Sequence, residues 1–266
     1  MSKKPKVLVL RTAGTNCDQE TAYAFQVCGA QVDPVHINKL IHREVDLHNY
    51  HILAIPGGFT YGDDIESGRI LANELRLHLK EEISTFIAEG KLAIGICNGF
   101  QVLVRAHFLP GNHNGAPVSR QTATLTNNDS GKFEDRWIYL KTDCPSVWTK
   151  GLKDIIYFPV AHAEGKFITD QKTLESLKNN GQIAFRYCNN DGRKPAYPQN
   201  PNGSVDDIAG ITDKTGRLLG LMPHPERHFL GTQHPRWSRS KKASKLGDGA
   251  GIFQNGVNYV KEKLLK

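Results

Sequence analysis

One cysteine lies where an apolar run of strand length gives way to apolar residues at helical spacing. The run covers residues 91–96, residues 98–107 have the helical spacing, and Cys97 occupies the turn between them. Gly95 and Gly99 flank it in the G-x-C-x-G spacing of a nucleophile elbow, where small neighbours let a strained turn present a nucleophile above a sheet. A sulfur at a helix N-terminus is also favoured as the thiolate. The stretch indicates a nucleophilic cysteine, although a core cysteine beside a tight turn has the same spacing.

A thiol nucleophile needs an imidazole to take its proton and a carboxylate to orient that imidazole. His224 and Glu226 are candidates, because Pro225 between them favours an extended backbone at the residue before it. In an extended chain, side chains two residues apart point to the same side. Two alternatives remain open, a structural histidine in a proline-rich turn and a metal site shared with His228. The metal site would leave the cysteine elbow unexplained.

The elements that position these residues alternate between strands and helices in the first part of the chain. The pattern predicts strands at 7–10, 31–36 and 51–55 and helices at 17–28 and 67–89, the last with Leu71, Leu75, Leu79, Ile83 and Ile87 at four-residue spacing. Such alternation predicts a largely parallel sheet that binds ligands beyond the carboxyl ends of its strands. Pro56-Gly57-Gly58 follows one of these strands and lacks a P-loop lysine. It is better suited to aim a backbone N–H at a developing oxyanion.

The second part of the chain changes character. Three apolar stretches follow one another without helices between them, which predicts an antiparallel excursion: 121–127, 133–141 and 155–160. A helix at 170–179 and a strand at 182–188 come next. A hairpin of residues 208–212 and 217–222 then leads directly into His224.

Composition limits the class of protein. The 266 residues fit one large α/β domain, and 34 Lys and Arg against 27 Asp and Glu give a net charge of +7, which suits anionic partners without requiring nucleic acid. The five cysteines are odd in number and widely spread, which argues against a disulfide framework or a zinc knuckle and favours a reduced, cytoplasmic protein. The apolar run after Lys6 is too short for a signal peptide. No run is long enough to span a membrane.

Several separated motifs together resemble one family. Gly95-Ile-Cys97-Asn-Gly99-Phe-Gln101, with Pro56-Gly57-Gly58 and Pro223-His224-Pro225-Glu226, is similar to the class I, triad-type glutamine amidotransferases. The sequence motifs that contain Asp63, His162 and His228 make the resemblance more specific. They are similar to those of the glutaminase subunits that serve a synthetase of purine synthesis. This resemblance runs from about residue 5 to 230. Ala163 stands where that family usually has glycine.

The resemblance implies a flavodoxin-like three-layer α/β sandwich, with a mostly parallel central sheet and an antiparallel excursion. It implies that Cys97 attacks the side-chain amide of glutamine, that His224 moves the proton and that Glu226 orients it. The backbone N–H groups of Gly58 and Asn98 would form the oxyanion hole. Three further residues would line the glutamine pocket, namely Gly57, Gln101 and His162. No metal is implied.

The resemblance also implies partners. A synthetase subunit would use ATP and Mg to convert formylglycinamide ribonucleotide with the released ammonia, a small third subunit would bridge the two, and this chain would hold no cofactor of its own. Residues 1–266 would form one glutamine amidotransferase domain with a basic extension at about 227–250 and a C-terminal helix at about 252–265. The basic extension has three interpretations: a solvated loop, a docking surface for the synthetase and, third, a nucleic-acid contact, for which it lacks a motif. A different cysteine hydrolase on a related α/β fold, such as a thioesterase or peptidase, and a non-catalytic binding module are the alternatives.

Overall fold

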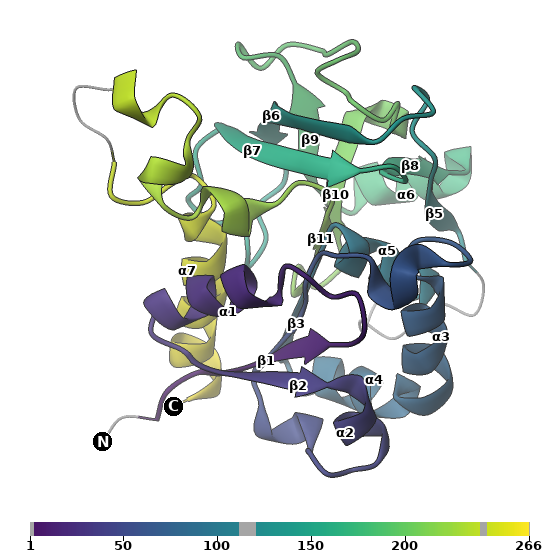
Figure 1. Ribbon diagram of the computed structural model, residues 1–266, viewed down its shortest axis with the longest axis vertical. Coiled ribbons are helices and arrows are strands. Elements are labelled where there is room, and N and C mark those ends of the chain that lie inside the picture. The colour runs from purple at the N-terminus through teal and green to yellow at the C-terminus, as the bar shows by residue number, and fades with distance from the viewer. Residues whose placement is uncertain (1–2, 112–120, 240–243, 266) are drawn as a thin grey trace.

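The computed structural model describes residues 3–111, 121–239 and 244–265, and one large sheet runs through most of it (Figure 1). Five strands at one side of the sheet are parallel and lie in the order β2 (Gln31–His36), β1 (Lys6–Arg11), β3 (Ile52–Ile55), β4 (Leu92–Ile96) and β11 (Leu218–Leu221). All residues of the three central strands, β3, β4 and β11, are buried. Burial on both faces explains why these strands read as continuous apolar runs in the sequence.

The same sheet continues beyond β11 with antiparallel strands. Their order is β10 (Ile208–Thr212), β9 (Ile183–Cys188), β6 (Glu134–Thr142) and β7 (Ile155–His162). Two short strands, β5 (Ala123–Thr126) and β8 (Lys166–Thr169), form a separate antiparallel pair. The predicted antiparallel excursion is therefore present, and it extends the central sheet.

Helices cover both faces of the parallel strands, as Figure 1 shows. On one face α1 (Asp18–Val27) packs against α7 (Ala250–Tyr259), with Phe25 and Phe253 edge to face at 5.0 Å between ring centroids. On the other face lie α3 (Arg69–His78), α4 (Lys80–Ala88) and α5 (Asn98–Arg105). The remaining helices are α2 (Ile37–Ile41) and α6 (Gln171–Asn179). The predicted α/β class with a helix–sheet–helix layering is confirmed.

The single long helix predicted over 67–89 is wrong, because the chain breaks at Leu79 into α3 and α4. Leu79 has φ −125° and ψ 10°, outside the helical region. A stripe with a strict period of four drifts around a helix that has about 3.6 residues per turn. The break corrects this drift, so that all five stripe residues are buried in the core: Leu71, Leu75, Leu79, Ile83 and Ile87.

Other elements differ from the sequence prediction in smaller ways. Both α2 and β8 were missed, and the C-terminal helix begins at Ala250 and ends in a π-helical segment at Val260–Leu264. The described part of the basic extension contains short 3-10 turns at Pro225–His228, Gly231–Gln233 and Trp237–Arg239. Lys241 and Lys242 lie outside the described residues. No helix within the described ranges has the length and apolar character needed to cross a membrane.

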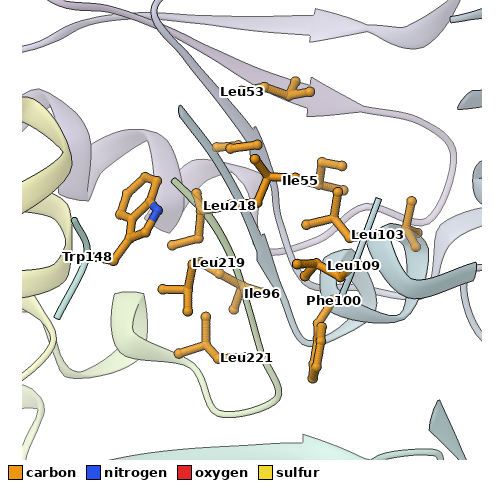
Figure 2. Packing of buried hydrophobic residues seen from close by; sticks show 14 of the residues in the cluster. Leu53, Ile55, Ile96, Phe100, Leu103, Leu109, Trp148, Leu218, Leu219 and Leu221 are labelled. Atoms are coloured by element: carbon orange, nitrogen blue, oxygen red, sulfur yellow. The ribbon is translucent and has the colours of Figure 1, made fainter. Parts of the chain in front are cut away.

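The packing beneath the sheet edge fixes helix α5 against β4 and β11. Figure 2 shows Phe100, Leu103 and Leu109 together on one side of these strands, with Leu219 and Leu221 of β11 on the other side. A Cβ on Gly220 of β11 would stand 2.7 Å from Leu109 and would collide with the ring of Phe100. The missing side chain at this glycine thus lets Phe100 lie flat against the strand. Helix α5 is therefore held close to the carboxyl ends of the parallel strands.

Candidate active site

Cys97 occupies the turn between β4 and α5 in a conformation that L-residues rarely adopt. Its φ is 51° and its ψ is −106°. Its N–H donates to the carbonyl of Leu221 on β11 over 2.8 Å, and its own carbonyl accepts from the N–H of Phe100 over 3.0 Å. A strained residue persists only where its surroundings hold it from several sides. Here the neighbouring strand and the following helix both do so, which gives Cys97 the geometry of a nucleophile elbow.

The two glycines beside Cys97 are required by close contact. A Cβ on Gly99 would collide with the backbone oxygen of Ile55 in β3, and a Cβ on Gly95 would collide with the backbone oxygen of Gly99. Helix α5 therefore begins directly above the ends of β3 and β4. The G-x-C-x-G spacing has the steric origin that the sequence indicated.

His224 and Glu226 follow β11 and form a buried pair. The N–H of His224 donates to the carbonyl of Pro159 on β7 over 2.9 Å, which anchors the turn. The ring Nδ1 of His224 lies 2.6 Å from Oε1 of Glu226. Because the carboxylate can only accept, Nδ1 carries the proton. His224 Nε2 has no hydrogen-bond partner among the described residues.

The pKa of His224 is raised well above its usual value of 6.5. Burial alone would lower it, but the negative charges of Glu226 and of the Cys97 thiolate outweigh burial. The imidazole is thus suited to accept a proton from a thiol and to remain charged beside the thiolate. This electrostatic arrangement is the one that activates a cysteine nucleophile.

Gly57 lies between the imidazole and Cys97. A Cβ on Gly57 would stand 2.8 Å from Cε1 of His224 and 3.4 Å from Cβ of Cys97, so no larger residue fits. The Cys97 thiol lies 3.7 Å from the carbonyl oxygen of Ala161. The unpartnered Nε2 of His224 is the ring nitrogen left to receive the Cys97 proton.

Two backbone N–H groups near Cys97 have no secondary-structure acceptor in the part of the chain that the structure describes. Asn98 is the first residue of α5. The first N–H groups bonded within the helix are those of Phe100 and Gln101, which donate to the Cys97 carbonyl, so the N–H of Asn98 has no acceptor within the helix. Gly57 O accepts from the N–H of Cys17 over 3.2 Å, and in a trans peptide the N–H of Gly58 then points the opposite way. Gly58 has φ +145°, a value open to glycine alone. These are the two donors predicted for an oxyanion hole.

Comparison with known proteins places this arrangement in a family. The model of the CobB/CobQ-like glutamine amidotransferase domain matches residues 4–260. The chain is 47% identical over 262 residues, 97% of its length and 99% of the relative's, to phosphoribosylformylglycinamidine synthase subunit PurQ of Dehalococcoides mccartyi. It is 44% identical, over 97% of its length and 99% of the relative's, to the PurQ subunit of Treponema denticola. The chain belongs to the glutamine amidotransferase family.

A solved structure agrees with this assignment. The structure of PurLQS from Thermotoga maritima contains a chain that matches with a TM-score of 0.74 at 28% identity, covering 97% of this chain and all of the other. A glutamine amidotransferase from Thermotoga maritima matches at 16% identity with a TM-score of 0.55, which shows the shared fold alone.

The side chains after Cys97 form a polar network in this glutamine amidotransferase. Asn98 Oδ1 accepts from the hydroxyl of Thr60 over 2.6 Å, and its Nδ2 donates to Oε1 of Gln101 over 3.0 Å. Gln101 Nε2 donates to the backbone oxygen of Glu164 over 2.6 Å. Both ends of the Gln101 amide are thus engaged. Gln101 was predicted to line a glutamine pocket, and its amide braces the backbone at Glu164 against α5.

His162, the last residue of β7, is buried and neutral. Burial and the nearby charge of His224 lower the pKa of His162 to about 4. Its Nδ1 lies 3.1 Å from Oδ1 of Asn128, which also accepts from the N–H of Gly165. Nδ1 is therefore the donor, which leaves Nε2 as an acceptor without a hydrogen-bond partner among the described residues.

The structure also shows residues that sequence reasoning missed. The sulfur of Cys17 lies 4.0 Å from Nδ1 of His224. Cys17, His224 and Glu226 together form a group of described residues whose ligand atoms lie close enough to hold a metal ion. Arg227 donates to the Cys17 sulfur over 3.0 Å, which opposes binding of a cation there. His228, named in the alternative metal site, instead bonds the carbonyl of Tyr157 over 2.7 Å. The sequence feature that could have indicated Cys17 is its position at the start of the first predicted helix.

Proposed function

We propose that the chain is the glutaminase subunit of phosphoribosylformylglycinamidine synthase, which releases ammonia from glutamine at Cys97. The observation that carries the proposal is the strained elbow cysteine beside a buried His224–Glu226 pair. The relatives at 40–47% identity that bear the name of that synthase subunit support it. The whole of residues 1–266 then acts as one amidotransferase domain.

The reaction follows from the positions of the three side chains. Cys97 transfers its proton to Nε2 of His224, and the thiolate attacks the side-chain amide carbon of glutamine. The charged imidazole returns the proton to the leaving nitrogen, so that ammonia departs and a glutamyl thioester remains. A water molecule then gives a proton to His224 while its oxygen attacks the thioester, which releases glutamate and restores the thiol. Glu226 keeps the Nδ1 proton in place throughout.

The backbone provides the charge stabilisation that both steps need. The N–H groups of Gly58 and Asn98 are proposed to bind the oxyanion, since neither has a secondary-structure partner and both flank Cys97. Gly57, Gln101 and His162 are proposed to line the glutamine pocket. His162 supports this assignment because its buried, neutral Nε2 is free to accept a hydrogen bond from the substrate. Gln101 contributes by bracing the backbone at Glu164, two residues beyond His162.

The partners are proposed from the names of the relatives. Ammonia passes to a synthetase subunit that uses ATP and Mg to convert formylglycinamide ribonucleotide to formylglycinamidine ribonucleotide, and a small third subunit bridges the two. The Thermotoga maritima structure supports such an assembly, because its name PurLQS joins an L, a Q and an S component. This chain needs no cofactor, nucleic acid or membrane for its own step. A cytoplasmic location is supported by five cysteines that all remain unpaired.

The free subunit is proposed to hydrolyse glutamine slowly until the synthetase binds. Cys97 is only 5% exposed, so glutamine reaches it only after neighbouring groups move. Phe59, next to the Gly57–Gly58 turn, is 45% exposed and stacks on the 50% exposed Phe133 at 6.3 Å. A partner that covers this aromatic pair would move the turn. Glutaminase turnover with and without the synthetase and its nucleotide tests this, and equal rates in the two states would reject it.

The experiment that tests the main proposal is labelling by 6-diazo-5-oxonorleucine, an electrophile shaped like glutamine. We expect stoichiometric modification of Cys97, mapped by mass spectrometry, and complete loss of glutaminase activity in the assembled synthase. Glutamine should protect against labelling. An unlabelled Cys97 in an active synthase would overturn the proposal, and a thioesterase or peptidase would give that result.

A further inference from the structure

Cys17 is a buried nucleophilic residue that the proposed reaction does not use. It lies in the loop after β1 at the N-cap of α1 and is 1% exposed. Its backbone is fixed at both groups: the carbonyl accepts from the hydroxyl of Thr21 over 2.6 Å, and the N–H donates to the carbonyl of Gly57 over 3.2 Å. The residue is therefore held firmly in place.

The bond from Cys17 N–H controls a peptide that matters for catalysis. The carbonyl of Gly57 and the N–H of Gly58 belong to the same peptide group. While Gly57 O points at Cys17, Gly58 N–H is fixed in the opposite direction. Rotation of this peptide would break the bond to Cys17. The backbone of Cys17 thus determines where one proposed oxyanion donor points.

The side chain of Cys17 contacts His224 and the residue that follows Glu226. Its sulfur lies 4.0 Å from Nδ1 of His224, on the side of the ring that faces Glu226. The thiol donates to Oδ1 of Asn16 over 3.2 Å and accepts from Nη2 of Arg227 over 3.0 Å. Arg227 directly follows Glu226. The sulfur therefore bonds to the residue next to the catalytic carboxylate and packs against the catalytic imidazole.

Cys17 is not placed to act as a second nucleophile. It faces Nδ1, which carries a proton and donates it in a hydrogen bond to Glu226 over 2.6 Å, so Cys17 has no base. Burial raises the pKa of its thiol. A neutral thiol can donate to Asn16 and accept from Arg227 at the same time, which is the pattern observed.

We propose that Cys17 is a positioning residue that keeps the Gly57–Gly58 peptide in register with the His224–Glu226 pair. The inference rests on the proposed function, since it concerns how the oxyanion donor and the imidazole of that same site stay aligned. Cys17 contacts both groups: its backbone N–H binds the carbonyl of Gly57, and its sulfur packs against the ring of His224. Loss of the sulfur leaves the Arg227 donor without its partner and opens space beside the imidazole.

The test compares Cys17→Ala and Cys17→Ser with a matched control, Cys28→Ala, in the assembled synthase. Cys28 lies at the other end of α1, is buried to a similar degree, and has none of the contacts to the site that Cys17 has. We expect Cys17→Ala to lower kcat for glutamine hydrolysis roughly tenfold, the order seen when a residue that orients a catalytic group is removed. KM should stay unchanged, because the substrate pocket is not altered.

The pH dependence of kcat distinguishes positioning from a merely structural role, because a structural role would not change it. The contact with Cys17 raises the pKa of His224, so its loss should shift the alkaline limb of kcat to lower pH. Cys17→Ser should recover most of the rate and the limb, because a hydroxyl can also accept from Arg227 and donate to Asn16. Cys28→Ala should match the unaltered enzyme in both.

Each outcome decides the inference. If Cys17→Ala and Cys28→Ala have the same kcat and pH profile, or if Cys17→Ser is as slow as Cys17→Ala, Cys17 does not position the site. If Cys17→Ala fails to fold, Cys17→Val, which fills the space but can neither donate to Asn16 nor accept from Arg227, must show the lowered kcat and the shifted limb relative to Cys28→Ala. An inactive Cys97→Ala beside a fully active Cys17→Ala rejects this inference only, whereas an active Cys97→Ala rejects the proposed function itself.

Discussion

Two cysteines lie at the N-caps of two helices in this molecule, and their surroundings differ. Cys17 precedes α1 with φ −102°, and Cys97 precedes α5 with φ 51°. Neither side chain makes a capping hydrogen bond, and both residues are buried. The helix dipole favours a thiolate at either position. A helix N-terminus is thus common to both and does not distinguish them.

The difference lies in backbone strain and in which nitrogen of His224 each sulfur can reach. Cys97 is held above the ends of β3 and β4 by two glycines, and its charge raises the pKa of His224, whose Nε2 has no partner among the described residues. Cys17 faces Nδ1, whose N–H already donates to Glu226, and its sulfur accepts a hydrogen bond from Arg227. Nucleophilicity therefore follows from the elbow and the free base together. The same helix-cap position without them gives a positioning residue.

The largest effect that this comparison predicts is that of Cys97→Ala. Glutaminase activity of the assembled synthase should fall by at least about a thousandfold, the order found when a triad nucleophile is removed. Synthesis from added ammonia should persist, because the synthetase chemistry lies in another subunit. Cys188→Ala, also buried but on β9, is the control and should retain full glutaminase activity. A well-folded Cys97→Ala that keeps glutaminase activity would remove the distinction between the two cysteines.

The base gives the second effect. His224→Ala should lower the glutaminase rate about a hundred- to ten-thousandfold, since the imidazole moves the proton in both steps. Glu226→Gln should be less damaging, because an amide oxygen can still accept from Nδ1 and hold the ring, while the charge that raises the pKa of His224 is lost. Steady-state kinetics of both variants will measure the ordering. Equal residual rates would show that orientation matters as much as proton transfer.

The elbow itself can be tested through stability. In Gly99→Ala the new Cβ meets the backbone oxygen of Ile55, which cannot yield as a flexible side chain can. Such overpacking should lower the free energy of unfolding by about 1–3 kcal/mol. Gly251→Ala is a matched control, since Gly251 is likewise the second residue of its helix but its new Cβ meets only the end of the Leu152 side chain. Equilibrium unfolding in urea will compare them, and equal losses would mean that close contact at the elbow is unimportant.

Much of the parallel half was predictable because most of its strands, unlike the edge strand β2, are buried on both faces. Continuous apolar runs marked β1, β3 and β4, and a glycine-flanked cysteine marked the turn after β4. Because parallel strands carry their ligands beyond one shared edge, those turns were expected at the same place. His224 followed from its own proline-rich motif at the end of β11. The fold class and the candidates Cys97, His224 and Glu226 therefore came from local patterns.

The parts that sequence reasoning missed depend on contacts between distant segments. Cys17 reaches His224 because the loop after β1 forms a bridge between Thr15 and Gly58, and no local pattern signals such a bridge. The break at Leu79 depends on which faces of α3 and α4 meet the sheet. The role of Gln101 as a brace depends on the backbone of Glu164, which a motif cannot place. Tertiary contacts of this kind set the register of the site.

The smallest predicted effect concerns chemical reactivity and alters no residue. Burial raises the pKa of the Cys17 thiol, so it remains protonated at neutral pH, while the Cys97 thiol can pass its proton to His224. Iodoacetamide at pH 7 should therefore modify Cys97 and leave Cys17 intact, and Cys17 should react only as the pH is raised. Mass spectrometry of timed samples will follow each cysteine separately between pH 6 and pH 10. This range brackets the pKa of a free thiol, which is about 8.5. Cys144, which is partly exposed, reports whether reagent is in excess. If Cys17 and Cys97 react at the same rate at pH 7, the position beside Nδ1 does not keep a thiol neutral, and the contrast between the two helix caps does not hold.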